Sequence, residues 1–163
     1  ATHVSSSWPA HPHFEEDDVA CVNDYPAFIA RVRNRIHCTD KELAWAGNSW
    51  RRKLENLHRL YPDKPILVSE FGYPSLQDTR GGAMGEDTQA RALMAEARGM
   101  AAPYVTGITV WCWADHPWPE ENFVRYMTTS PYGVLKRDRT KTRAFSVVTR
   151  LFRQKQSDAH RSP

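Results

Sequence analysis

Lys64-Pro-Ile-Leu-Val-Ser-Glu70-Phe-Gly72 is the stretch from which the rest of the chain can be interpreted. Pro65 keeps the residue before it out of the helical region and so favours an extended segment. Residues 66–68 then form a short apolar run, which is typical of a strand buried on both faces. Glu70 follows directly, and a polar residue at the carboxyl end of a parallel strand is often catalytic. We therefore predict a buried strand that ends in a functional carboxylate; the alternative is a glutamate in a surface loop.

Composition indicates a globular protein and excludes several classes of partner. The chain has 163 residues, 40% of them hydrophobic, and a net charge of +3 from 22 basic and 19 acidic residues. This balance does not point to nucleic acid. No apolar stretch approaches the roughly 20 residues that cross a bilayer. The three cysteines, an odd number without metal-ligand spacing, predict free thiols in the cytoplasm. We expect no metal and no cofactor.

Strand-like and helix-like segments alternate along the chain. Apolar or extended runs lie near residues 1–7, 19–22, 65–69 and 105–111. Helical spacing of apolar residues follows in 50–61, with Ser49 as the expected N-cap, then in 88–100 and from about 141. This order predicts a parallel sheet with helices outside it. We expect one domain over residues 1–155 and a disordered polar tail over 156–163.

Four motifs together resemble the family 2 glycoside hydrolases, the β-galactosidase and β-glucuronidase family. Residues 64–72 resemble the seventh barrel strand, which ends in a Glu followed by an aromatic residue and Gly. Trp111-Cys-Trp-Ala-Asp115 is similar to the end of strand eight. Gly133-Val-Leu-Lys-Arg-Asp-Arg139 resembles the closing segment before helix eight, and Asn23-Asp-Tyr25 the end of strand six. The resemblance implies an α/β fold that is half of a (β/α)8 TIM barrel, strands five to eight.

The resemblance also implies roles for individual residues. Retaining glycosidases use two carboxyl groups, one as nucleophile and one as acid/base. Glu70 matches the nucleophile, and Tyr25, on the adjacent strand, is the expected hydrogen-bond donor to it. The remaining positions implied in sugar binding are Asn23, Trp111, Trp113, Asp115 and Trp8. The alternatives are a core tyrosine for Tyr25, ordinary core tryptophans, and an Asp115 that only holds its loop.

Two departures from the family pattern bear on function. The family's acid/base Glu follows an Asn at the end of strand four, and no Asn-Glu pair occurs in this sequence. We therefore expect the isolated chain to be inactive or weakly active. Glucuronidases place Asn-x-Lys before the Gly of the closing segment, where this chain has Ser130-Pro131-Tyr132. The resemblance therefore does not extend to glucuronide specificity and leaves a neutral sugar open.

Two functions from different classes remain. The first is the carboxyl-terminal half of a glycoside hydrolase barrel, which acts on carbohydrate only with its missing half. The second is a non-catalytic half-barrel that self-associates or binds carbohydrate. A half-barrel exposes strand edges and inner apolar residues, among which we expect Ile66, Val68, Ile108 and Val110, so a second copy is a further expected partner. An unrelated flavodoxin-like domain is disfavoured because no phosphate loop is present.

Overall fold

The computed structural model describes residues 2–5, 13–29, 38–75, 84–117 and 129–159. The chain forms two compact units. The first comprises residues 1–71 and 95–110, and the second comprises residues 72–94 and 111–163. None of the described helices is long and apolar enough to cross a membrane.

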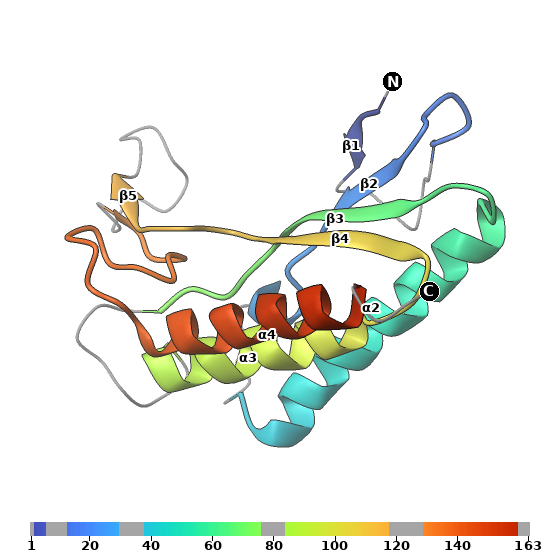
Figure 1. Ribbon diagram of the computed structural model, residues 1–163. Helices are drawn as coiled ribbons and strands as arrows, with labels where there is room; N and C mark the ends of the chain where they lie inside the picture. The colour runs from blue at the N-terminus through green and yellow to red at the C-terminus, as the bar shows by residue number, and fades with distance from the viewer. Residues whose placement is uncertain (1, 6–12, 30–37, 76–83, 118–128, 160–163) are drawn as a thin grey trace. The chain divides into compact units, whose positions relative to one another are not determined.

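The first unit is built on a parallel four-stranded sheet in the order β1-β2-β3-β4. The strands are β1 (Val4–Ser5), β2 (Ala20–Asn23), β3 (Ile66–Phe71) and β4 (Val105–Val110). Figure 1 shows helix α2 (Asp40–Leu60) on one side of this sheet. The predicted α/β class and the parallel direction of the four strands are confirmed.

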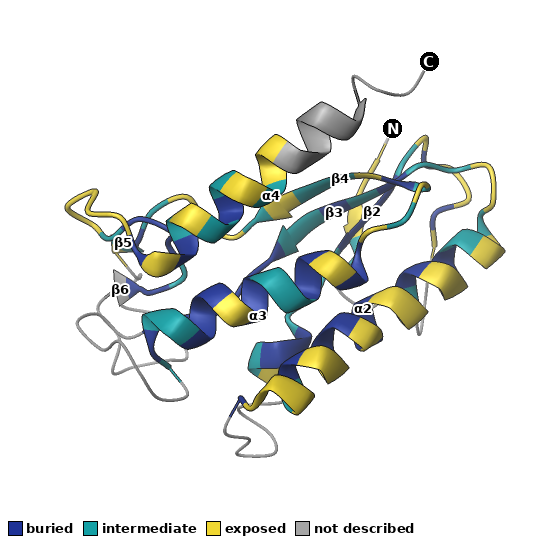
Figure 2. Cartoon of the chain, turned by 60° about the horizontal axis from the view of Figure 1, so that its bottom comes forward, coloured by how far each residue is buried: buried dark blue, intermediate teal, exposed yellow. Residues whose placement is uncertain are grey.

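Helix α2 begins ten residues before the position predicted for it. Thr39 is its N-cap, and the Thr39 hydroxyl and the Glu42 carboxylate form a reciprocal capping box. Ser49, expected as the cap, is buried inside the helix. The capping box satisfies two backbone donors at once, so the helix begins after Thr39 and Ser49 lies within it. Figure 2 shows one buried and one exposed face along α2.

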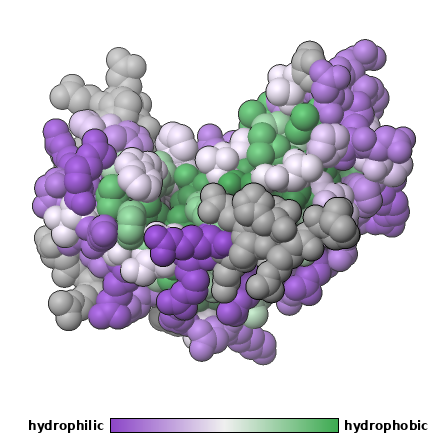
Figure 3. Space-filling model, in the orientation of Figure 1, coloured by the Kyte–Doolittle hydropathy of each residue, from purple (hydrophilic) through white to green (hydrophobic). Residues whose placement is uncertain are grey.

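The burial of the strands corrects the expected inner face of the sheet. Ile66 and Val68 have no exposed surface, whereas Ile108 and Val110 are half-buried. Leu67 and Gly107, which pair with each other, are both half-buried; Leu67 lies between Ile66 and Val68 and so points to the opposite face of the sheet from them. A run of three apolar residues does not reveal which positions point to which face, so the expected assignment of Ile66 and Val68 to an exposed face was wrong. Figure 3 shows apolar side chains gathered over the sheet on one face of the molecule.

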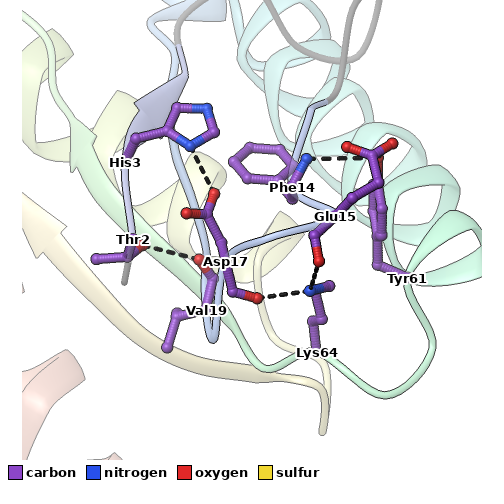
Figure 4. Close-up of polar contacts among 8 residues, drawn as sticks. All are labelled: Thr2, His3, Phe14, Glu15, Asp17, Val19, Tyr61 and Lys64. Carbon is purple, nitrogen blue, oxygen red and sulfur yellow. Dashed lines mark hydrogen bonds and ion pairs between the residues drawn. The ribbon is translucent and has the colours of Figure 1, made fainter.

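A polar cluster joins the starts of strands β1, β2 and β3 (Figure 4). His3 lies 2.5 Å from the Asp17 carboxylate and stacks on Phe14 with ring centroids 5.0 Å apart. The Lys64 ammonium donates to the backbone carbonyls of Glu15 and Asp17 at 2.8 and 2.5 Å. These contacts lie at the amino ends of the strands, away from the strand ends that carry Asn23 and Glu70.

The second unit contains a short antiparallel pair and a terminal helix. Strands β5 (His116–Pro117) and β6 (Thr129–Ser130) pair with each other, and α4 covers Arg143–Ala159. Helix α3 (Glu86–Gly99) contributes to both units, since the boundary falls after Met94. Helix α4 continues past residue 155 into the segment expected to be a tail, because no Gly or Pro interrupts residues 143–159.

Candidate active site

The carboxylate of Glu70 and the hydroxyl of Tyr25 meet at the carboxyl ends of neighbouring parallel strands. The Tyr25 hydroxyl donates a hydrogen bond of 2.6 Å to Glu70 Oε2. Asn23, the last residue of β2, pairs in register with Glu70 on β3 after a shift in register at Val22. The side chains of Tyr25 and Glu70 are both half-buried. A short hydrogen bond to a carboxylate fixes the direction of the whole group, so one oxygen is held while the group stays reachable from solvent.

An ion pair supports the loop that carries Tyr25. Asp24 Oδ1 accepts a hydrogen bond from the Tyr25 backbone N–H at 2.8 Å, and its Oδ2 forms an ion pair with the Lys53 ammonium. The Asp24 N–H donates to the carbonyl oxygen of Glu70 at 3.3 Å. Lys53 comes from the centre of α2, so this helix is connected to the end of β2 through Asp24. The arrangement holds the backbone of Tyr25 beside Glu70.

A second carboxyl group, Glu96 of α3, contacts the same loop. Glu96 has no exposed surface, and its Oε1 accepts a hydrogen bond from the Ala27 N–H at 3.1 Å. Burial raises the pKa of Glu96 well above its ordinary value, and the negative charge of Asp24 adds to the rise. The hydrogen bond from the Ala27 N–H, the nearby Trp50 side chain and the charge of Lys53 oppose it. Burial is the largest of these effects, so the folded chain favours the protonated form of Glu96.

Two of the three tryptophans predicted to bind sugar belong to the second unit, and both are exposed. Trp111 is 38% exposed and meets the edge of His116, with ring centroids 5.8 Å apart. Trp113 is 64% exposed and lies against Phe145 with centroids 6.0 Å apart. Exposed indole faces of this kind are available to the apolar faces of sugars. Trp8 lies outside the described residues.

Asp115 anchors its own loop. It is 7% exposed, and its Oδ1 accepts a hydrogen bond of 2.7 Å from the Gly133 N–H. A Cβ atom at Gly133 would lie 2.2 Å from the Asp115 nitrogen, so only glycine fits there. Of the two roles considered for Asp115, the geometry favours holding the loop over binding a sugar hydroxyl.

Thiol and metal chemistry find little support near these residues. The Cys112 pKa is raised to about 11, first by burial and then by the negative charge of Asp115, so its thiol is protonated at neutral pH. Among the described residues, no group of three His, Cys, Asp or Glu side chains could hold a metal ion.

The sequence pointed to Tyr25 and Glu70, whose expected contact is present, but it missed Lys53 and Glu96. A signal for Glu96 exists. It occupies the third position after Leu93, within the apolar stripe that continues to Ala97 and Met100. A carboxylate on the buried face of a helix is costly unless it is hydrogen-bonded or functional.

Comparison with known proteins identifies similar folds among solved structures. No protein-family model and no curated protein matches the chain. A β-glucuronidase of Faecalibacterium prausnitzii matches 92% of the chain with a TM-score of 0.69 and 15% identity. A GH2 β-galacturonidase of Eisenbergiella tayi, bound to galacturonate, matches 84% with a TM-score of 0.66 and 20% identity. Ruminococcus gnavus β-glucuronidase matches 86% with a TM-score of 0.68 and 21% identity.

The chain has the fold of a segment of these glycosidases. It covers 24%, 24% and 23% of their respective lengths, so it spans about a quarter of each. At this level of identity the likeness concerns the fold, and the chemistry has to be argued from the residues of the glycosidase-like segment itself.

Proposed function

We propose that this chain is the carboxyl-terminal half of the (β/α)8 catalytic barrel of a family 2 retaining glycoside hydrolase. In this proposal, β1 to β4 are barrel strands five to eight, Glu70 is the nucleophile, and the acid/base comes from a half that this sequence does not contain. The observation that carries the proposal is the hydrogen bond from Tyr25 to Glu70 Oε2 at the ends of two neighbouring parallel strands. The glycosidase-like fold supports it.

The chemistry divides between the two halves. The Glu70 carboxylate attacks the anomeric carbon, a bond forms between its oxygen and that carbon, and the bond to the leaving oxygen breaks. The acid of the missing half gives its proton to that leaving oxygen. Water then attacks the glycosyl-enzyme ester and gives its proton to the same residue, now acting as a base. The sugar is released, and the Glu70 carboxylate is regenerated.

An activated glycoside tests the nucleophile without the missing half. The reagent is a deoxyfluoro glycoside whose leaving group, dinitrophenolate, departs without protonation. Its fluorine slows hydrolysis of the glycosyl-enzyme, so the label persists. We expect mass spectrometry of digested peptides to find the sugar attached to Glu70, and to find no label in Glu70→Gln. Attachment to another carboxylate, or equal labelling of Glu70→Gln, would contradict the proposal. Galactoside and glucuronide versions of the reagent, compared side by side, report which sugar is accepted.

A second candidate is a carbohydrate-binding half-barrel without catalysis. The exposed indoles of Trp111 and Trp113 favour it, together with the absence of an Asn-Glu acid/base motif from the sequence. Binding of a neutral disaccharide that is lost in Trp113→Ala, with no labelling of Glu70 by the activated glycoside, would favour this second function.

A further inference from the structure

Glu96 is a buried acid for which the proposed chemistry has no use. Its side chain has no exposed surface, although Glu is among the residues least often buried without a partner. Oε1 accepts the Ala27 N–H at 3.1 Å across a separation of 69 residues. This contact joins the end of α3 to the loop that follows β2.

The backbone next to Ala27 carries Tyr25. Residues 26–29 are helical, and the Ile29 N–H donates to the Tyr25 carbonyl oxygen at 2.8 Å. The Ala27 N–H lies in the first turn of this segment, where backbone donors have no partner within the helix. Glu96 supplies that partner. The turn held in this way begins with the tyrosine whose hydroxyl lies 2.6 Å from Glu70 Oε2.

Two glycines allow the helices around Glu96 to approach closely. A Cβ atom on Gly47 of α2 would lie 2.4 Å from the Ala95 carbonyl oxygen, and one on Gly99 of α3 would lie 2.0 Å from the Gly47 carbonyl oxygen. The backbones therefore touch within one turn of Glu96. On α2, Trp50 and Lys53 follow Gly47 at one-turn spacing, and Lys53 forms the ion pair with Asp24.

We infer that Glu96 is a positioning residue: by accepting the Ala27 N–H, it holds the turn 25–27 so that the Tyr25 hydroxyl engages Glu70. The effect of Glu96 on glycoside chemistry rests on the proposed function. The link from Glu96 through the Ala27 N–H to Tyr25 and Glu70 does not. Protonated Glu96 is closely mimicked by Gln, whose side-chain oxygen accepts the same hydrogen bond. Leu fills a similar volume and accepts none, so Glu96→Gln and Glu96→Leu separate hydrogen bonding from packing.

The experiment measures the link between Tyr25 and Glu70 in each background. In the full chain with carbon-13 in its glutamate carboxyl groups, the Glu70 resonance is assigned by its loss in Glu70→Gln. We expect Tyr25→Phe to shift this resonance in the wild type and in Glu96→Gln. In Glu96→Leu we expect the shift to be largely lost, because the hydroxyl no longer reaches Oε2. The same shift in Glu96→Leu as in the wild type would overturn the inference. Glu55→Gln, an exposed change on α2, is the control.

Amide hydrogen exchange gives a second readout that needs no sugar, and its wild-type measurement needs no variant. We expect the Ala27 amide to exchange at least about fivefold faster in Glu96→Leu than in Glu96→Gln, the equivalent of one lost hydrogen bond. An unprotected Ala27 amide in the wild type would overturn the inference by itself. Failure of the activated glycoside to label Glu70, with the Tyr25 coupling intact, would count against the proposed function and leave the positioning role standing.

Discussion

Tyr25 acts on Glu70 at the scale of a single hydrogen bond, by fixing where the carboxylate points. The bond engages Oε2, so the rotation of the carboxyl group is restricted and the second oxygen keeps one direction. Preorganisation of this kind matters for attack on carbon, because a nucleophile displaced by about 1 Å can lose on the order of 100-fold in rate.

Removal of the Tyr25 hydroxyl should therefore slow the proposed chemistry more than it destabilises the fold. We expect Tyr25→Phe to reduce the rate at which the activated glycoside labels Glu70 by roughly 10- to 100-fold. The free energy of unfolding should fall by only about 1 kcal/mol. Tyr104→Phe is the matched control, since it removes a hydroxyl from a ring stacked on His58 and leaves Glu70 untouched. Equal labelling rates for wild type and Tyr25→Phe would show that the hydroxyl does not orient the nucleophile.

The ionisation of Glu96 makes a prediction about pH. In the folded chain its pKa lies well above the ordinary value of 4.5, because the side chain is buried. Well below pH 4.5 the group is protonated in the folded and unfolded chains alike, and between the two pKa values only the unfolded chain releases the proton. Stability from this group is therefore complete at low pH and is lost as the pH rises through the folded pKa. Each tenfold difference in proton affinity between the two states corresponds to about 1.4 kcal/mol.

Glu96→Gln lacks this titration and serves as the reference. We expect the unfolding free energy of the wild type, minus that of Glu96→Gln, to decrease in urea titrations as the pH rises from the ordinary value of 4.5 toward the folded pKa. Taking the difference removes the contributions of other carboxylates such as Glu15 and Asp138. Their pKa values are lowered, so their effect on the pH dependence of stability has the opposite sign. A difference that does not change with pH would mean that folding does not raise the pKa of Glu96.

At the scale of elements, the sequence predicted contacts that depend on strand order and missed those that depend on helix packing. Parallel strands place their carboxyl ends at one edge of the sheet, so the contact between Tyr25 and Glu70 could be predicted from the sequence. The start of α2 was missed because Ser49 is as good a cap as Thr39 when each is considered alone, and the reciprocal bond with Glu42 decides between them. Glu96 was missed because its environment is created by the crossing of α2 and α3.

That crossing depends on two residues without side chains. We expect Gly47→Ala to lower the free energy of unfolding by about 1–3 kcal/mol, the usual cost of overpacking, despite the better helix propensity of Ala. The reason is the backbone oxygen of Ala95, 2.4 Å from the new methyl group. Asn48→Ala, at the next and exposed position, gains propensity without a clash and should be neutral or stabilising. Urea unfolding of both variants measures the difference, and equal stability would rule out the close approach.

For the whole molecule, the open sheet is the feature that calls for a partner. In the described sheet β1 and β4 lie at the two ends of the strand order, and strand edges pair readily with other chains. We propose that the chain associates with a complementary half-barrel or, without it, with a second copy. Two copies related by a two-fold axis would close eight strands but set the two Glu70 residues across the barrel from each other.

Self-association should therefore occur without efficient catalysis. We expect sedimentation at micromolar concentration to show a dimer or larger species, and the same sample to leave a natural disaccharide intact, because general acid catalysis is typically worth about 10²–10⁴-fold. A well-folded monomer would contradict the first expectation. Robust hydrolysis of the disaccharide would contradict the second and would mean that another carboxylate gives the proton.

The order β1-β2-β3-β4 also has a consequence for synthesis on the ribosome. Each of these strands pairs with the strand synthesised just before it. A newly synthesised strand can therefore pair at once, and no strand has to be inserted between two others. Parallel pairing is slow when its partners are distant in the chain, and translation at roughly 5–20 residues per second gives each pair time to form before the next arrives. The capping box of α2 lies between β2 and β3, so this helix can form and cover β2 before Glu70 has left the ribosome.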